Sequence, residues 1–206
     1  MQKKAIFLDL DNTIYAVSSI GDKLFKPILQ LITESGEYSG NFKDIKAEIF
    51  RRPFQAIAEE FSFSEQLKSG CLMLLEDLKY KENIEPFEDY KLISGYHCKK
   101  FLVTAGFAKM QYSKIKMLGI ENDFDKIVVI DPGCSDLTKK EIFLEIMNEY
   151  NFKSEEVIIV GDDLNSEIKA GQELGIDTVL YVHNSEHRGI KGQAIITNFR
   201  ELEQYL

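Results

Sequence analysis

Two aspartates, Asp9 and Asp11, come directly after the apolar run Ala5 to Leu8, in the segment Asp9-Leu10-Asp11-Asn12-Thr13. Residues two apart on an extended chain point the same way, so we expect both carboxylates to project from the carboxyl end of a strand. Two like charges that close repel each other unless a cation or a proton relieves them. Two loop aspartates that cap a turn and a helix would give the same pattern. The apolar run before them favours a chemical role.

A second acidic group follows another apolar run. Gly161-Asp162-Asp163 comes after Val157 to Val160, with Asn165 and Glu167 close behind. Carboxylate oxygens suit Mg²⁺, which takes one or two protein carboxylates and keeps several waters. The alternative is a strand-to-helix loop in which an aspartate caps the helix. If both strands belong to one sheet, their acidic ends can share a single cation.

Two further segments could bind an anion. Thr104 and Ala105 end another apolar run, and a hydroxyl with neighbouring backbone N–H groups at a strand end can hold phosphate oxygens. Lys139 and Lys140 lie at the start of a predicted helix, where a lysine opposes the helix dipole unless its ammonium meets an anion. Alone, each segment has an ordinary interpretation, a turn for the threonine and solvated lysines for the pair.

The rest of the chain supplies the elements that must position these side chains. Short apolar runs rich in Ile and Val are continuous rather than alternating, which is typical of a parallel sheet covered on both faces. Helical patterns follow a candidate capping box of Thr138 and Glu141 and cover Ser166 to Leu174, before Gly175. This order predicts an α/β fold with a doubly wound, Rossmann-like parallel sheet. The expected strands are Ala5 to Leu10, Phe101 to Val103, Ile127 to Ile130, Val157 to Val160, Thr178 to Val182 and a weaker Ala194 to Ile196.

Residues 15–85 break this alternation, because their apolar residues have helical spacing and no convincing strand lies among them. We expect roughly four helices, inserted as a cap on a core formed by residues 1–14 and 86–206. An insertion at this point lies over the edge of the sheet where open α/β folds bind ligands, so it would choose the substrate. Candidate contacts are Tyr15, Arg51, Arg52 and Phe54, although a helix junction explains the two arginines better and cap packing explains the two aromatic residues better.

The order of these motifs resembles the haloacid dehalogenase-like (HAD) superfamily: Asp-x-Asp-x-Thr, then Thr104, then Lys139 or Lys140, then the acidic loop after Gly161. The inserted helices look like that superfamily's cap of the first type, and the opening motif is similar to its phosphatase and nucleotidase branch. The resemblance implies that Asp9 is a nucleophile that forms an aspartyl phosphate. Asp11 would then be general acid to the leaving group and base to the incoming water.

The resemblance also implies the remaining site. Mg²⁺ would be held by the side chains of Asp9 and Asp162 and the backbone carbonyl of Asp11. The transferring oxygens would be bound by Thr104, Ala105 and one lysine, with spacing from Phe143 favouring Lys139 over Lys140. Asp163 or Glu167 would orient the metal's waters or the lysine.

The presence of Asp11 favours phosphate-ester chemistry, because a halide leaves without needing a proton. We therefore expect a Mg²⁺-dependent phosphatase of a small phosphomonoester, a nucleotide or sugar phosphate. A phosphomutase using the same nucleophile is the alternative, and a catalytically idle HAD-fold binding protein is a third.

Composition limits the partners of the 206-residue chain. With 25 Lys+Arg against 34 Asp+Glu, its net charge of −9 argues against binding a nucleic-acid polymer. No apolar run reaches the ~20 residues that span a bilayer, and the N-terminus does not resemble a signal peptide. Cysteines Cys71, Cys98 and Cys134 are widely spaced, as in a reduced, cytoplasmic protein. We expect a monomer or dimer whose partner is a small phosphorylated metabolite.

Overall fold

The sheet is the centre of the fold. The computed structural model describes residues 2–183 and 192–206. Its six strands are all parallel and follow the order β3-β2-β1-β4-β5-β6. They confirm the predicted α/β fold and all six expected strands. Their bounds are β1 Ala5–Leu8, β2 Lys99–Ala105, β3 Lys126–Ile130, β4 Val157–Gly161, β5 Asp177–Tyr181 and β6 Ala194–Ile196.

Side chains along the strands alternate between two apolar cores, one on each face of the sheet. In β1, Ile6 and Leu8 belong to one core, whereas Ala5 and Phe7 belong to the other. All four are buried, which is why the run is continuously apolar. Phe7 also stacks on Phe143 with ring centroids 5.3 Å apart. Such a pair contributes ~0.5–1.5 kcal/mol beyond its buried area and holds the helix of Phe143 on the sheet.

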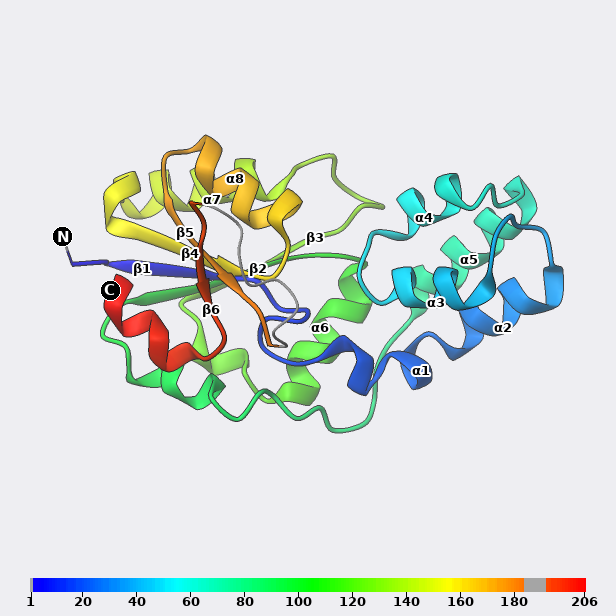
Figure 1. Ribbon diagram of the computed structural model, residues 1–206, viewed down its shortest axis with the longest axis horizontal. Coiled ribbons are helices and arrows are strands. Elements are labelled where there is room, and N and C mark those ends of the chain that lie inside the picture. Colours follow the sequence, from blue (N-terminus) through cyan, green and yellow to red (C-terminus); the bar gives the residue numbers. More distant parts are fainter. Residues whose placement is uncertain (1, 184–191) are drawn as a thin grey trace.

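Helices cover both faces of the sheet, α7 and α8 on one side and α6 with the C-terminal 3₁₀ helix η7 on the other (Figure 1). α7 begins with the predicted capping box of Thr138 and Glu141. The predicted helix Ser166 to Leu174 instead begins as a π-helical turn, η5, that continues into α8. The bounds are α6 Ala108–Leu118, α7 Lys139–Tyr150, α8 Lys169–Glu173, η2 Tyr90–Gly95, η3 Glu121–Asp123, η4 Ser154–Glu156, η5 Leu164–Ile168 and η7 Phe199–Tyr205.

The segment between β1 and β2 contains helices and no β-strand within residues 15–85, all of which the structure describes. The longer helices, α2 to α5, form a group beyond the carboxyl end of the sheet (Figure 1). α2 packs on α5, α3 packs on α4, and α5 also contacts α6. Across residues 2–183 and 192–206, no helix combines the length and apolar character that a membrane span requires. The bounds are η1 Val17–Ser19, α1 Gly21–Leu24, α2 Lys26–Ser35, α3 Phe42–Ile49, α4 Phe54–Glu60 and α5 Glu65–Asp77.

Candidate active site

The predicted site residues gather where the strand order changes direction. β1 lies between β2 and β4, and open α/β sheets bind ligands at the carboxyl ends of strands beside such a point. Asp9 follows β1, Thr104 lies near the end of β2, and Asp162 follows β4. Leu8 is in register with Val160, and the Asp9 N–H donates to the Val160 carbonyl at 3.1 Å. The two acidic strand ends therefore lie side by side.

Lys139 joins two of the carboxylates. It is the first residue of α7, and its ammonium Nζ lies 2.5 Å from Asp9 Oδ1 and 2.7 Å from Glu167 Oε2. All three side chains are buried, with exposed fractions of 7% for Lys139 and Asp9 and 1% for Glu167. Lys140 instead pairs with Glu173 on the surface. Of the two candidate lysines, the geometry favours Lys139.

The carboxylates of Asp9, Asp162 and Glu167 could hold a metal ion. Each offers one oxygen, and these atoms lie within 4.8 Å of one another. Burial, together with the neighbouring carboxylates, raises the pKa of Asp9 to about 7 and that of Asp162 to about 8. The Lys139 ammonium opposes these shifts, and despite burial it holds the pKa of Glu167 below its usual range. Three hard oxygen donors with one ammonium leave excess negative charge, which fits a divalent cation such as Mg²⁺.

Asp163 and Glu167, both predicted to support the site, have different places in it. The Asp163 carboxylate accepts from the Asn165 N–H at 2.8 Å and so caps the loop after β4. The Asp163 N–H donates to Glu167 Oε1 at 2.7 Å. Glu167 is therefore the residue that contacts Lys139, and Asp163 holds the loop that carries it.

Asp11 meets a different set of partners from Asp9. β1 ends at Leu8, so Asp11 does not continue the extended strand from which the two carboxylates were expected to project together. The Asp11 carboxylate accepts from Lys114 Nζ at 2.9 and 3.0 Å and from the Tyr15 hydroxyl at 2.5 Å. Although burial opposes it, these contacts hold the pKa of Asp11 below its usual value. Asp11 thus lies against α6, whereas Asp9 faces α7.

Gln111 connects Asp11 to the end of β2. Its side-chain nitrogen Nε2 lies 2.6 Å from Thr104 Oγ1, 3.0 Å from Asp11 Oδ2 and 3.2 Å from the Ala105 carbonyl. Neither Gln111 nor Lys114 was among the residues predicted from sequence, because α6 was not predicted. The buried residues of α6 recur at helical spacing, but Gln111 and Lys114 are polar and weaken the apolar pattern in the sequence.

Most residues expected to contact substrate are engaged within the protein. Tyr15 is fully buried with its hydroxyl on Asp11, and Phe54 is 7% exposed in the apolar core. The Arg52 guanidinium donates to two glutamates, at 3.1 and 2.6 Å. Arg51 and Arg52 are both exposed.

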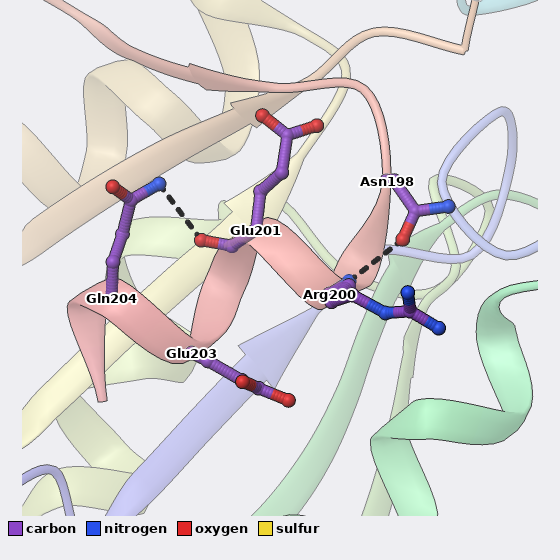
Figure 2. A pocket seen from close by; sticks show the side chains of 5 residues that line it. All are labelled: Asn198, Arg200, Glu201, Glu203 and Gln204. Carbon is purple, nitrogen blue, oxygen red and sulfur yellow. Dashed lines mark hydrogen bonds between the residues drawn. The ribbon is translucent and has the colours of Figure 1, made fainter.

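A hollow of about 760 Å³ lies elsewhere, on the surface of η7 (Figure 2). The hydrogen bonds drawn there are local: Arg200 N–H donates to the Asn198 side chain, and Gln204 donates to the Glu201 carbonyl. None of its lining residues belongs to the carboxylate cluster. We therefore place the candidate site at the strand ends, where charge and burial converge. The hollow is lined by Asn198, Arg200, Glu201, Glu203 and Gln204.

The sequence and the fold of this chain are similar to those of known proteins. Residues 3–175 match the family described as haloacid dehalogenase-like hydrolase. The chain is 23% identical over 197 residues to the glyceraldehyde 3-phosphate phosphatase of Methanopyrus kandleri, covering 85% of this chain and 82% of the relative. Its fold is similar to a hydrolase of that family, SP0104 from Streptococcus pneumoniae, with a TM-score of 0.72, 18% identity and 98% of each chain covered. It is also similar to the magnesium-bound putative HAD-hydrolase YfnB of Bacillus subtilis, with a TM-score of 0.64, 18% identity and coverage of 99% and 98%.

Proposed function

We propose a mechanism and a substrate class for this chain, which belongs to the haloacid dehalogenase-like hydrolase family. It is a phosphoric monoester hydrolase, and we infer a Mg²⁺-dependent one that acts on small phosphomonoesters through an aspartyl phosphate. The buried contact of Lys139 with Asp9, beside Asp162 and Glu167, is the observation that carries the proposal. This contact supports the proposal because a carboxylate that could attack phosphorus, an ammonium that could bind phosphate oxygens and carboxylates that could hold a metal ion lie together.

In the first step, a carboxylate oxygen of Asp9 attacks phosphorus. An Asp9 O–P bond forms as the ester P–O bond breaks. Asp11 must be in its protonated form for this step, and it gives that proton to the leaving oxygen, which departs as an alcohol. Lys139 and the Thr104 hydroxyl bind the phosphoryl oxygens over which negative charge spreads. Lys139 already contacts Asp9, so nucleophile and cation are preorganised.

In the second step, water attacks phosphorus of the aspartyl phosphate. A new O–P bond forms, the bond between phosphorus and Asp9 breaks, and Asp11, now a carboxylate, takes the proton of the water. The products are inorganic phosphate and the restored Asp9 carboxylate. Tyr15 and Lys114 hold the carboxylate form of Asp11, which this step requires.

The cluster of Asp9, Asp162 and Glu167 fits Mg²⁺. Asp9 and Asp162 would hold the ion together with the Asp11 backbone carbonyl that the family resemblance implies. When bound, the ion supplies charge that screens the anionic nucleophile from the anionic phosphate. The Lys139 ammonium also offsets part of the negative charge of Asp9 and Glu167.

Residues 15–85 form the cap in this proposal, because helices α2 to α5 lie beyond the strand ends that carry the site (Figure 1). The substrate is a phosphorylated sugar or triose, or a nucleotide. Relatives named glyceraldehyde 3-phosphate phosphatase favour the triose phosphate within that range.

The test is phosphate release from p-nitrophenyl phosphate, glyceraldehyde 3-phosphate, hexose phosphates and nucleotides, with Mg²⁺ or with EDTA. Wild type is compared with Asp9→Asn and with Asp44→Asn, which changes an exposed aspartate of α3. We expect Mg²⁺-dependent release that Asp9→Asn abolishes and Asp44→Asn retains.

Two results would overturn the proposal. Isomerisation of a sugar phosphate that depends on a bisphosphate, without net phosphate release, would indicate a phosphomutase. Binding of Mg²⁺ and phosphate esters without turnover of any ester would indicate an idle binding protein.

A further inference from the structure

Two polar side chains of α6 are buried beneath the site and end at Asp11. Gln111 is 0% exposed and Lys114 is 1% exposed. Burying an ammonium or an amide is costly unless its hydrogen bonds are satisfied. The Lys114 ammonium donates both of its hydrogen bonds to the Asp11 carboxylate, and this ion pair offsets the cost of burying the ammonium.

The Gln111 amide acts on two site residues through one nitrogen. Nε2 donates toward Asp11 Oδ2 and Thr104 Oγ1, and the Ala105 carbonyl lies nearby. The opposite amide orientation would turn a carbonyl oxygen toward a carboxylate and another carbonyl, which repel it. Because Thr104 accepts from Gln111, its own hydroxyl proton is left to donate elsewhere. In the proposed function, that proton is available to a phosphoryl oxygen.

Gly106 makes room for this arrangement. It lies in the left-handed region, with a φ of +146°, just after β2. A Cβ atom there would lie 3.1 Å from side-chain atoms of Gln111. A glycine at position 106 therefore leaves space for the Gln111 side chain next to the end of β2.

Lys114 and Tyr15 complete the set of donors around Asp11. The Lys114 ammonium touches both carboxylate oxygens, at 3.0 and 2.9 Å, and Tyr15 donates to Oδ1. Gln111 and Lys114 are three residues apart and therefore lie on the same face of α6. With donors on both oxygens, the Asp11 carboxylate is fixed in rotation as well as in place.

We propose that Gln111 and Lys114 are positioning residues, which hold the Asp11 carboxyl at the angle needed for proton transfer and turn the Thr104 hydroxyl toward the phosphoryl group. The inference rests on the proposed function, in which Asp11 protonates the leaving oxygen. The inference assigns to α6 the role of orienting the Asp11 carboxyl group, through the polar residues on its buried face.

The experiment compares two esters that differ in their need for an acid. p-Nitrophenolate leaves without a proton, whereas the alkoxide of glycerol phosphate needs one. The variants are Gln111→Met and Lys114→Met, with Asp11→Asn as the reference and Lys116→Met as a matched control, because Lys116 is an exposed lysine of the same helix. kcat/KM for each ester is measured with Mg²⁺, together with Tm.

We expect Asp11→Asn to lose ~10²–10⁴-fold in kcat/KM on glycerol phosphate and far less on p-nitrophenyl phosphate. The ratio of interest is kcat/KM on glycerol phosphate divided by kcat/KM on p-nitrophenyl phosphate. Gln111→Met and Lys114→Met should lower this ratio at least ~10-fold, while Lys116→Met leaves it unchanged. In an Asp11→Asn background, Lys114→Met should cause no further change in that ratio. Lys114→Arg, which keeps the cation, should recover part of it.

Equal losses on both esters, or a further fall of the ratio in the Asp11→Asn background, would overturn the inference and leave α6 a purely structural role. If Lys114→Met does not fold, Gln111→Met and Lys114→Arg carry the same comparison. An inactive wild type would instead contradict the proposed function. A selective effect of Asp11→Asn without one from the α6 variants would contradict this inference alone.

Discussion

The carboxylate of Glu167 occupies the space that a side chain on Gly161 would need. A Cβ atom at Gly161 would lie far inside van der Waals contact of the Glu167 carboxylate. Gly161 ends β4 directly before Asp162, and its missing side chain lets Glu167 reach Lys139. The glycine is needed here for space, since its φ is not in the left-handed region.

Gly161→Ala should therefore displace Glu167 and break its contact with Lys139. We expect a loss of ~1–3 kcal/mol in the free energy of unfolding, as for other overpacked sites, and at least a tenfold fall in kcat/KM. Urea denaturation and phosphatase assays measure the two effects. Gly95→Ala is the control, because a Cβ atom at Gly95 meets nothing within 4 Å. Wild-type behaviour of Gly161→Ala would show that Glu167 can move without consequence.

Lys139→Met and Lys140→Met separate the two adjacent lysines. Removing Lys139 leaves the buried Asp9 and Glu167 without their cation, so we expect a loss of ~3–5 kcal/mol in stability and ~10²-fold or more in kcat. Lys140 pairs on the surface with Glu173, and its removal should cost no more than ~1 kcal/mol. Thermal unfolding and turnover of p-nitrophenyl phosphate provide the readouts. A larger loss of turnover in Lys140→Met would reverse this assignment.

The sheet was predictable because each strand is buried on both faces. Runs such as Val157 to Val160 are apolar without interruption, and turns bound them. α7 was predictable from its capping box and apolar stripe. α6 was not, because its buried face carries Gln111 and Lys114 in place of apolar residues. The polar residues that interrupt its apolar pattern are those that reach the site.

Within the site, sequence indicated the residues at strand ends but not their partners. Residues such as Asp9 and Asp162 follow apolar runs, and a parallel sheet brings such positions to one edge. The partners of Asp11 depend on where β1 ends and how the chain then turns, with Asn12 at a φ of +57°. The helix-start position of Lys139 was visible in sequence, but its contact with Glu167 depends on the π-helical turn after β4.

Added Mg²⁺ should stabilise the protein through Asp162. A ligand at 100 times its Kd raises the free energy of unfolding by ~2.7 kcal/mol, so wild type should show a clear rise in Tm with Mg²⁺. Asp162→Asn should lose most of that rise, because it removes a carboxylate of the cluster. Asp163→Asn is the matched control: the asparagine oxygen can still accept from the Asn165 N–H and cap the loop, so the variant should keep both its stability and the Mg²⁺ response. The same response in both variants would argue against Asp162 as a ligand.

The metal-free protein carries a pH dependence of stability in the same cluster. Burial raises the pKa of Asp9 to about 7 and that of Asp162 to about 8, whereas both carboxyls titrate near ~4 in the unfolded chain. The folded state therefore binds more protons between pH ~4 and ~8, and the free energy of unfolding falls as pH rises through that window. The lowered pKa values of Asp11 and Glu167 act below it, where their stabilisation is lost as pH falls.

Asp162→Asn removes one of the two groups with a raised pKa, so its stability should fall less than that of wild type between about pH 5 and pH 8. Urea denaturation in EDTA at the two pH values measures the difference. Saturating Mg²⁺ should reduce the wild-type fall, because the cation stabilises the ionised carboxylates that folding otherwise disfavours. Asp163→Asn again serves as the control and should keep the wild-type slope. An identical fall in wild type and Asp162→Asn would mean that Asp162 is ionised throughout this range, with its charge already offset inside the folded protein.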